Sequence, residues 1–228
     1  STAGQDLLNL FFITFNKYVG KSDKNQAFTP DHITDFMAKI CNVNKSSVVL
    51  DMACGSGSFL VRAMTQALAD CHTQAEEDEV KKHHIYGVEY DELVYGLATT
   101  NMLIHSDGNS NIVQGSCFDE VPRFIKDGVK FNVVLMNPPY NAMAKQMPKK
   151  YSETWGKSKQ DPSKGLYFVK FILDQMNAND MQGKLAVLLP MACAIGNSTL
   201  MKQKKNAILK NNTLDAVFSL PDVIFYPR

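Results

Sequence analysis

Long hydrophobic runs, paired cysteines and a strong net charge are all missing from this 228-residue sequence. Without an apolar run of roughly 18 residues the sequence predicts no membrane span, and no secretory signal is evident at its start. The five cysteines are odd in number and form no Cys-x-x-Cys pair, which is typical of a reducing cytoplasm and offers no zinc site. A net charge of +1 neither indicates nor excludes a nucleic-acid partner, because a local basic face can lie within a neutral total. We therefore expect a soluble cytoplasmic protein with no membrane partner and no bound metal.

What the sequence does contain is a regular alternation of strand and helix patterns. Hydrophobic residues make up 45% and charged residues 21%, as in an ordinary globular protein. The patterns predict strands within 47–54, 85–91, 111–116, 131–136, 183–190 and 214–221, and helices at 5–19, 30–41, 59–82, 92–106, 165–179 and 198–211. Such alternation predicts an α/β fold with a doubly wound, mostly parallel sheet. We expect one domain over 1–228, with N-terminal helices in 1–45 and the sheet core in 46–228.

The first chemical motif is DMACGSG at 51–57, which follows the first predicted sheet strand. Open α/β sheets bind ligands at the carboxyl ends of their strands. Gly55 and Gly57 let the backbone turn sharply and approach a ligand that a Cβ atom would block. Asp51 begins this turn, so the motif indicates a ligand site, although a simple strand-to-helix turn remains an alternative.

The same motif argues against a dinucleotide. Leu60 stands where the third glycine of Gly-x-Gly-x-x-Gly belongs, and the next strand-end acid, Glu89, comes much later than the roughly 20 residues of that fingerprint. Glu89 nevertheless ends the second strand, where a carboxylate can accept both hydroxyls of a ribose. A ribose without a pyrophosphate favours S-adenosylmethionine over NAD; a solvent-facing acid is the alternative.

The second motif is the stretch FNVVLMNPPYNAM at 131–143, in which an apolar strand stops at Asn137 and two prolines. The amide oxygen of Asn137 and the carbonyl of Pro138 can accept two hydrogen bonds from one amino group. Such acceptors favour a pyramidal nitrogen and free the lone pair of an adenine or cytosine amino group for attack on a methyl group. Pro139 stiffens the turn, and Tyr140 offers a flat face for an extruded base. A rigid strand stop is the structural alternative.

A long irregular stretch, 141–164, follows this motif and carries six lysines. Its composition predicts a loop that buries no core and is mobile without DNA. Its lysines favour phosphate contact, with a solvated loop as the alternative. The lysines at 202–210 are more simply explained as the solvent-exposed face of an amphipathic helix. The sequence does not decide whether Trp155 packs in the core or against a partner.

The ordered set FTP (28–30), DMACGSGSF (51–59), NPPY (137–140) and GKLAVLLP (183–190) resembles the amino-methylating DNA adenine methyltransferases. The segments AFTPDHITDFMAKI and VVLDMACGSGSFL look most like the methylation subunit of type I restriction–modification systems. The likeness extends from about residue 5 to the end. It implies an S-adenosylmethionine-dependent methyltransferase fold of Rossmann-like type and transfer of a methyl group to N6 of adenine in DNA.

The resemblance also implies where the functional residues lie. The methionine part of the cofactor would lie beside Phe28, Thr29 and Pro30 and above Asp51, Gly55 and Gly57. Its ribose would be bound by Glu89, and its adenine would lie beside Ser116, Cys117 and Phe118. The catalytic residues would be Asn137, Pro138, Pro139 and Tyr140. The sequence departs from the family pattern at Ser116, where an aspartate usually accepts from the cofactor's adenine amino group. It departs again at Met52, where proline is common.

The family continues beyond the point where this sequence stops, so the resemblance predicts the catalytic domain of a longer subunit. DNA would be read by a separate specificity subunit, with a restriction subunit as a further partner. Two alternatives remain: a protein-glutamine methyltransferase, in which the same acceptors grip a side-chain amide, and a non-catalytic scaffold. The FTP element and the lysine-bearing loop favour DNA.

Overall fold

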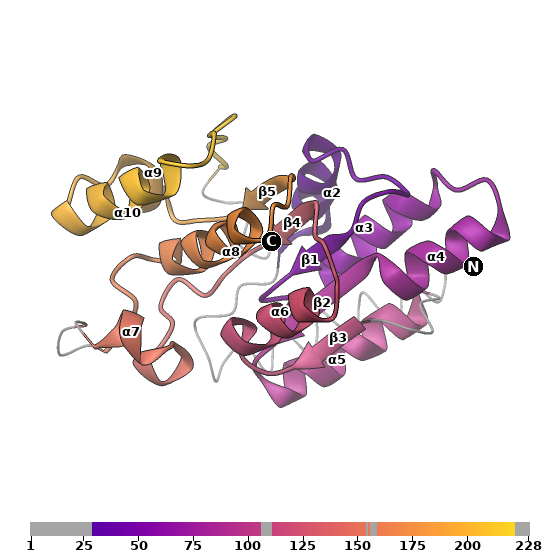
Figure 1. The fold of residues 1–228 in the computed structure, drawn as a ribbon, viewed down its shortest axis with the longest axis horizontal. Coiled ribbons are helices and arrows are strands. Elements are labelled where there is room, and N and C mark those ends of the chain that lie inside the picture. The colour runs from indigo at the N-terminus through magenta and orange to yellow at the C-terminus, as the bar shows by residue number, and fades with distance from the viewer. Residues whose placement is uncertain (1–28, 106–110, 154, 156–158, 222–228) are drawn as a thin grey trace.

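The computed structural model of the chain describes residues 29–105, 111–153, 155 and 159–221 (Figure 1). Its centre is a five-stranded, all-parallel sheet in the order β3-β2-β1-β4-β5. The strands are β1 (Val49–Asp51), β2 (Ile85–Glu89), β3 (Asn111–Gln114), β4 (Val133–Met136) and β5 (Lys184–Val187). The predicted α/β fold with a parallel sheet is confirmed. The helix expected at 5–19 lies outside the described residues.

Successive strand residues point to opposite faces of the sheet, and each face is covered by helices. In β1, Val49 belongs to one hydrophobic cluster and Leu50 to the other, and Val133 and Val134 of β4 divide in the same way. The first cluster is formed with α2 (Asp31–Ile40), α3 (Ser58–Leu68), α4 (Gln74–His83) and α5 (Glu92–Ile104), and the second with α6 (Cys117–Lys126) and α8 (Leu166–Ala178). The sheet is therefore doubly wound, as predicted.

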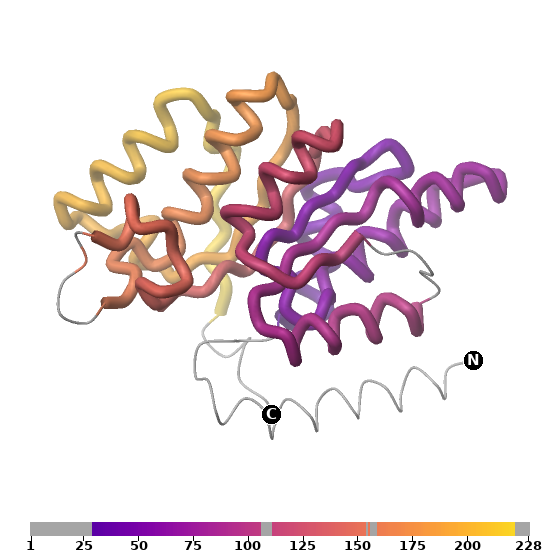
Figure 2. Tube along the Cα trace, turned by 60° about the horizontal axis from the view of Figure 1, so that its bottom comes forward, coloured from indigo at the N-terminus to yellow at the C-terminus, as the bar shows by residue number. Residues whose placement is uncertain are grey.

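Two further helices extend the second layer. Figure 2 shows α10 (Thr199–Leu209) alongside α8, and the short helix α9 (Met191–Ile195) precedes α10. A small cluster of Leu166, Cys193 and Met201 joins α8, α9 and α10. Within the described ranges, no helix is both long and apolar enough to cross a membrane.

The strand order places a crevice at the middle of the sheet. From β1 the chain continues outward through β2 to β3, whereas β4 lies on the other side of β1 and leads outward to β5. The carboxyl ends of β1 and β4 thus flank the point at which the winding direction changes. Ligands bind at such switch points in open α/β sheets, which makes this edge the expected site.

The prediction of one helix over 59–82 was wrong. The structure has two helices there, because α3 ends at Leu68 and Thr73 caps the start of α4. The Thr73 hydroxyl accepts a hydrogen bond from the Glu76 backbone N–H, and the Glu76 carboxylate accepts one from the Thr73 backbone N–H. This reciprocal capping box begins a new helix, and its Thr-x-x-Glu signature was present in the sequence. Helices α6 and α9 were not anticipated either.

The strand predicted at 214–221 is also absent, since residues 213–221 have no regular secondary structure. The segment docks through side chains instead of backbone pairing. The Phe218 ring meets the Phe36 ring of α2 edge-on, with centroids 5.1 Å apart, and Leu220 packs against the first core cluster. The large apolar side chains Leu214, Val217 and Phe218 nevertheless stay mostly exposed, so this apolar pattern of β type is neither paired in the sheet nor buried.

The loop predicted over 141–164 is more ordered than its composition indicated. It contains a 3₁₀ turn (Ala144–Gln146), a helical turn α7 (Lys149–Ser152) and a bridge between Met143 and Gln160. Met147 and Trp155 are buried in the second core cluster, with the indole 6.0 Å from the Tyr167 ring of α8. The prediction that this loop buries no core was therefore wrong, because the Trp155 ring and the Met147 side chain anchor it on the protein.

Candidate active site

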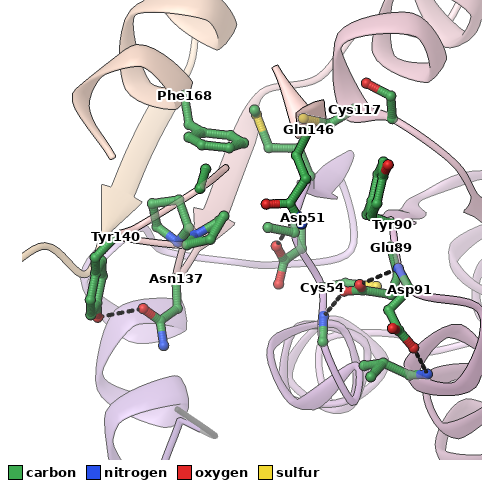
Figure 3. A pocket seen from close by; sticks show the side chains of 18 of the residues that line it. Asp51, Cys54, Glu89, Tyr90, Asp91, Cys117, Asn137, Tyr140, Gln146 and Phe168 are labelled. Atoms are coloured by element: carbon green, nitrogen blue, oxygen red, sulfur yellow. Dashed lines mark hydrogen bonds between the residues drawn. The ribbon is translucent and has the colours of Figure 1, made fainter. Parts of the chain in front are cut away.

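A cavity of about 350 Å³ opens at the carboxyl ends of β1, β2 and β4 (Figure 3). This is the size of many small-molecule sites. Of the residues predicted from the sequence, the cavity is lined by Thr29, Asp51, Gly55, Glu89, Ser116, Cys117, Phe118, Asn137, Pro138, Pro139 and Tyr140. Pro30 and Gly57 do not line it, and Phe28 lies outside the described residues. One cavity thus brings together motifs that are far apart in the sequence.

The two glycines of the turn have different tasks. Both have left-handed backbone conformations, with φ of +56° at Gly55 and +80° at Gly57. A Cβ atom on Gly57 would lie 3.5 Å from the Ala98 carbonyl oxygen, an ordinary contact distance, so it is the left-handed φ, and not crowding against α5, that favours glycine there. A Cβ atom on Gly55 would meet no protein atom within 4 Å and would instead occupy the cavity. The sequence predicted that both glycines lie beneath a ligand; of the two, only Gly55 lines the cavity.

Asp51 is an unusual buried acid at the end of β1. Its Oδ1 accepts a hydrogen bond of 3.1 Å from the Ala53 backbone N–H. Its Oδ2 is buried and has no hydrogen-bond partner among the residues that the structure describes. Burial, with a smaller contribution from the nearby charge of Glu89, raises the pKa of Asp51 from 3.8 to about 8. An orphaned carboxylate oxygen at a cavity wall is the environment in which a cationic ligand group is stabilised.

Glu89 holds the glycine turn in place while facing the same cavity. Its Oε2 accepts from the Gly55 backbone N–H and its Oε1 from the Asp91 backbone N–H, both at 2.9 Å. Burial raises the pKa of Glu89, although these backbone hydrogen bonds act in the opposite direction. Each carboxylate oxygen has two lone pairs, so both can accept a further hydrogen bond from a ligand hydroxyl.

Asn137 is held between two hydroxyl groups. Its Nδ2 donates to Thr29 Oγ1 at 3.1 Å. Its Oδ1 accepts from the Tyr140 hydroxyl at 2.7 Å (Figure 3). The sequence predicted an acceptor at Asn137 and a flat ring at Tyr140 but not the hydrogen bond between them. Gly165 closes the turn from behind, because a Cβ atom there would lie 3.3 Å from the Pro138 ring. The tetrapeptide is therefore held by hydrogen bonds on one side and close packing on the other.

The start of α6 forms another wall of the cavity. Ser116 is the N-cap residue, yet its hydroxyl makes no capping hydrogen bond, and it lines the cavity. Burial raises the pKa of the Cys117 thiol, which therefore stays protonated. The Phe118 ring packs against Phe168 and Phe171 of α8, with centroids 5.3 and 4.8 Å away. This wall is apolar except at Ser116.

Several lining residues were missed by sequence reasoning. Tyr90 follows Glu89 directly and is 49% exposed at the cavity, so an aromatic residue after a strand-end acid was the available signal. Gln146 comes from the 3₁₀ turn in the loop, and its Oε1 accepts from the Met143 backbone N–H at 2.8 Å. Phe168 comes from α8 (Figure 3). Nothing local in the sequence distinguishes Phe168 from its apolar neighbours.

The lysines of the loop divide by environment. Lys145 lies at the cavity, and Lys149 and Lys150 are exposed. Lys164 instead donates to Asn141 Oδ1 at 2.9 Å, directly after the tetrapeptide Asn137–Tyr140.

The lysines of α10 are partly engaged with the protein. The Lys204 ammonium lies 4.1 Å from the centre of the Tyr167 ring, and Lys205 donates to the carbonyl oxygens of Ala194 and Gly196. A search of the described ranges finds no cluster of three or more His, Cys, Asp or Glu side chains suited to a metal ion.

Comparison with known proteins places the chain in a family. A family model described as N-6 DNA Methylase matches residues 5–228. The type II restriction enzyme and methyltransferase RM.BcgI of Heyndrickxia coagulans is 34% identical over 226 residues, which cover 97% of this chain and 32% of that protein. The EcoEI methylase subunit of a type I restriction enzyme from Escherichia coli is 25% identical over 209 residues, covering 88% of this chain and 39% of that protein.

Among solved structures, a modification subunit of a putative type I restriction enzyme from Vibrio vulnificus YJ016 superposes with a TM-score of 0.66 at 20% identity. The match covers 92% of this chain and 44% of that one, and it shows the shared fold. The chain thus spans about a third of the length of the two curated relatives. The resemblance inferred from the four motifs is confirmed, and the chain belongs to the N-6 DNA methylase family.

Proposed function

We propose that this chain transfers a methyl group from S-adenosylmethionine to N6 of adenine in DNA, as the methylation part of a restriction–modification enzyme. One observation carries the proposal. A single cavity joins the strand-end acids Asp51 and Glu89 to the turn Asn137–Tyr140, so a cofactor site and an amino-group site are adjacent. Membership in the N-6 DNA methylase family supports the same chemistry.

The lining residues fit the cofactor group by group. The buried, unpartnered Asp51 Oδ2 suits the ammonium of the methionine part, and the two Glu89 oxygens suit the ribose hydroxyls. The Tyr90 ring and the apolar wall at Cys117 suit the adenine, with the Ser116 hydroxyl as a hydrogen-bond partner at its edge. When bound, S-adenosylmethionine supplies a methyl group on a positively charged sulfur, which is a strong electrophile.

The tetrapeptide Asn137–Tyr140 supplies hydrogen-bond acceptors for the amino group of the target adenine. The Asn137 amide oxygen and the Pro138 carbonyl accept hydrogen bonds from the adenine amino group, which favours its pyramidal form and localises the lone pair for attack. A duplex base must leave the stack to reach such a pocket. The Tyr140 and Phe168 rings, both at the cavity, offer flat surfaces for the extruded base.

We further propose DNA and other subunits as partners. The exposed Lys149 and Lys150 belong to the loop whose Lys145 and Gln146 line the cavity, and they suit phosphate contacts. Because this chain covers only about a third of the matched relatives, we propose that it is the catalytic domain of a larger protein. Sequence reading would then belong to a specificity subunit or domain, and cleavage to a restriction subunit.

The test is transfer of a tritiated methyl group from S-adenosylmethionine, measured in the full-length protein together with its specificity partner. The expected result is label in N6-methyl-2′-deoxyadenosine after the DNA is digested to nucleosides, lost in Asn137→Ala and retained in the matched control Asn179→Ala at the far end of α8. Label in protein glutamine would instead support the side-chain amide alternative. Cofactor binding without any transfer would support a scaffold.

A further inference from the structure

The contact between Thr29 and Asn137 joins the part of the site assigned to the cofactor to the part assigned to the target. The two residues are 108 positions apart, and the hydrogen bond runs from Asn137 Nδ2 to Thr29 Oγ1 at 3.1 Å. Thr29 lies just before α2, and the Pro30 carbonyl accepts the first hydrogen bonds of that helix from Ile33 and Thr34. Ile33 is buried in the first core cluster, so the hydroxyl is presented by a helix that is fixed to the core.

An asparagine amide must be oriented to act as an acceptor. Its oxygen and its NH₂ group exchange places by rotation about the terminal torsion, which is broad and roughly two-fold. The oxygen can accept a hydrogen bond from an adenine amino group. The NH₂ group is itself a donor, so facing the adenine amino group it would form no hydrogen bond. Tyr140 alone does not select the orientation, because its hydroxyl can donate to the oxygen or accept from the NH₂ group.

The Thr29 hydroxyl can also either donate to Asn137 or accept from it, unless its hydrogen is already donated to another group. A threonine hydroxyl has one hydrogen and two lone pairs. Thr29 lines the cavity, and an anionic group that takes its hydrogen leaves the oxygen an acceptor only. The oxygen then requires the NH₂ end of Asn137, and the amide oxygen is turned away from Thr29, toward Tyr140.

We propose that Thr29 is a positioning residue that couples cofactor binding to target recognition: it orients the Asn137 amide, and it does so when the carboxylate of the cofactor's amino-acid part holds its hydroxyl hydrogen. This inference rests on the proposed function and deepens it. It assigns Thr29 a task in selecting the target amino group, in addition to any contact with the cofactor. Cofactor binding then prepares the acceptor before the base arrives.

The experiment measures target preference instead of turnover. The full-length protein with its specificity partner is titrated with two duplexes, one with adenine at the target position and one with purine, which lacks the amino group. Each titration is made with and without saturating S-adenosylhomocysteine, which retains the carboxylate but has no methyl group to transfer. In the wild type we expect the ligand to increase the preference for adenine by about 3- to 10-fold, the value of one oriented hydrogen bond.

Variants of Thr29, a matched control and a double variant separate positioning from folding. Thr29→Val, which keeps the shape but removes the hydroxyl, should abolish the ligand-induced preference, whereas Thr29→Ser should retain it. Thr65→Val is the matched control, because it makes the same change at an exposed residue of α3 whose hydroxyl bonds only within its helix. On an Asn137→Ala background, Thr29→Val should cause no further loss.

The inference is overturned if Thr29→Val keeps the ligand-induced preference, if Thr29→Ser loses it, or if Thr29→Val lowers it further without Asn137. These outcomes are distinct from a failure of the proposed function. That failure would appear in the wild type itself, as no transfer of tritiated methyl to adenine.

Discussion

Replacing Asp51 by asparagine should change how the stability of the cofactor-free chain depends on pH. Burial raises the pKa of Asp51 from 3.8 to about 8 in the folded state. Between these two values the folded protein binds more protons at this site than the unfolded chain does, so its free energy of unfolding falls as the pH rises. The stabilising contribution of the protonated carboxyl is complete at acidic pH and is lost as the pH increases toward about 8.

The size of the effect follows from the same two pKa values. Each pH unit inside this window is worth about 1.4 kcal/mol, reduced near its upper end, so the loss between about pH 6 and pH 8 is about 2 kcal/mol. For a chain of this length that corresponds to about 4–8 °C in melting temperature. The asparagine side chain of the variant would still accept from the Ala53 N–H, and its NH₂ group would lie without a partner at both pH values. Any cost of that group therefore cancels from the pH difference.

The assay is calorimetric melting of the purified, cofactor-free chain at pH 6 and pH 8. The wild type should lose about 4–8 °C more than Asp51→Asn over this interval, while Asp119→Asn, an exposed acid on α6, should follow the wild type. Glu89 titrates in both proteins, so the difference between them reports Asp51 together with its electrostatic coupling to Glu89. Saturating S-adenosylhomocysteine should stabilise the wild type more than Asp51→Asn. Parallel melting curves for the two proteins would refute the argument that Asp51 is buried without a cationic partner.

Four other variants test the remaining parts of the site. Asn137→Ala should lower turnover by about 10²–10³ with little change in cofactor affinity, since the lost group acts on the target; unchanged turnover in single-turnover kinetics would reduce the tetrapeptide to a strand stop. Tyr140→Ala should weaken binding of DNA containing an extruded target base by roughly 1–3 kcal/mol, measured by fluorescence anisotropy against DNA lacking that base. Neutralising Lys149 and Lys150 together should weaken DNA binding and make the slope of log K against log salt concentration shallower by about two units. An identical slope would mean that both lysines are solvent-exposed without phosphate contacts. Gly55→Ala should lower the melting temperature, because a left-handed residue other than glycine costs about 1–2 kcal/mol, and should also weaken cofactor binding in calorimetry.

Much of the fold was predictable because its signals are local. The five sheet strands carry short apolar runs that end at turn residues, and the alternation with amphipathic helices indicates a parallel sheet. The site residues at strand ends were predictable for the same reason: in a parallel sheet, Asp51, Glu89 and Asn137 must come to one edge once their strands are aligned. The capping box at Thr73 was a readable local signal that an apparently continuous helix ends and restarts.

Other features depended on contacts between distant segments. An apolar pattern at 214–221 reads as a strand, but only tertiary packing shows that Phe218 rests on Phe36 of α2. Trp155 could not be assigned from the sequence, because the ring of Tyr167 that it meets belongs to another element. Short-range patterns report what a segment can form, and burial against a partner decides what it does form.

The division between the two sources of information is clearest at the turn Asn137–Tyr140. The sequence by itself determined that a strand ends in Asn-Pro-Pro-Tyr and that two acceptors on a stiff backbone suit an amino group. Only the tertiary structure decided that the Asn137 amide lies between Thr29 and Tyr140, that Gly55 lines the cavity while Gly57 does not, and that Asp51 Oδ2 has no hydrogen-bond partner among the described residues. The physical reason is that hydrogen-bond partners, close packing and desolvation are properties of the space around a side chain, and most of that space is filled by residues far away in the chain.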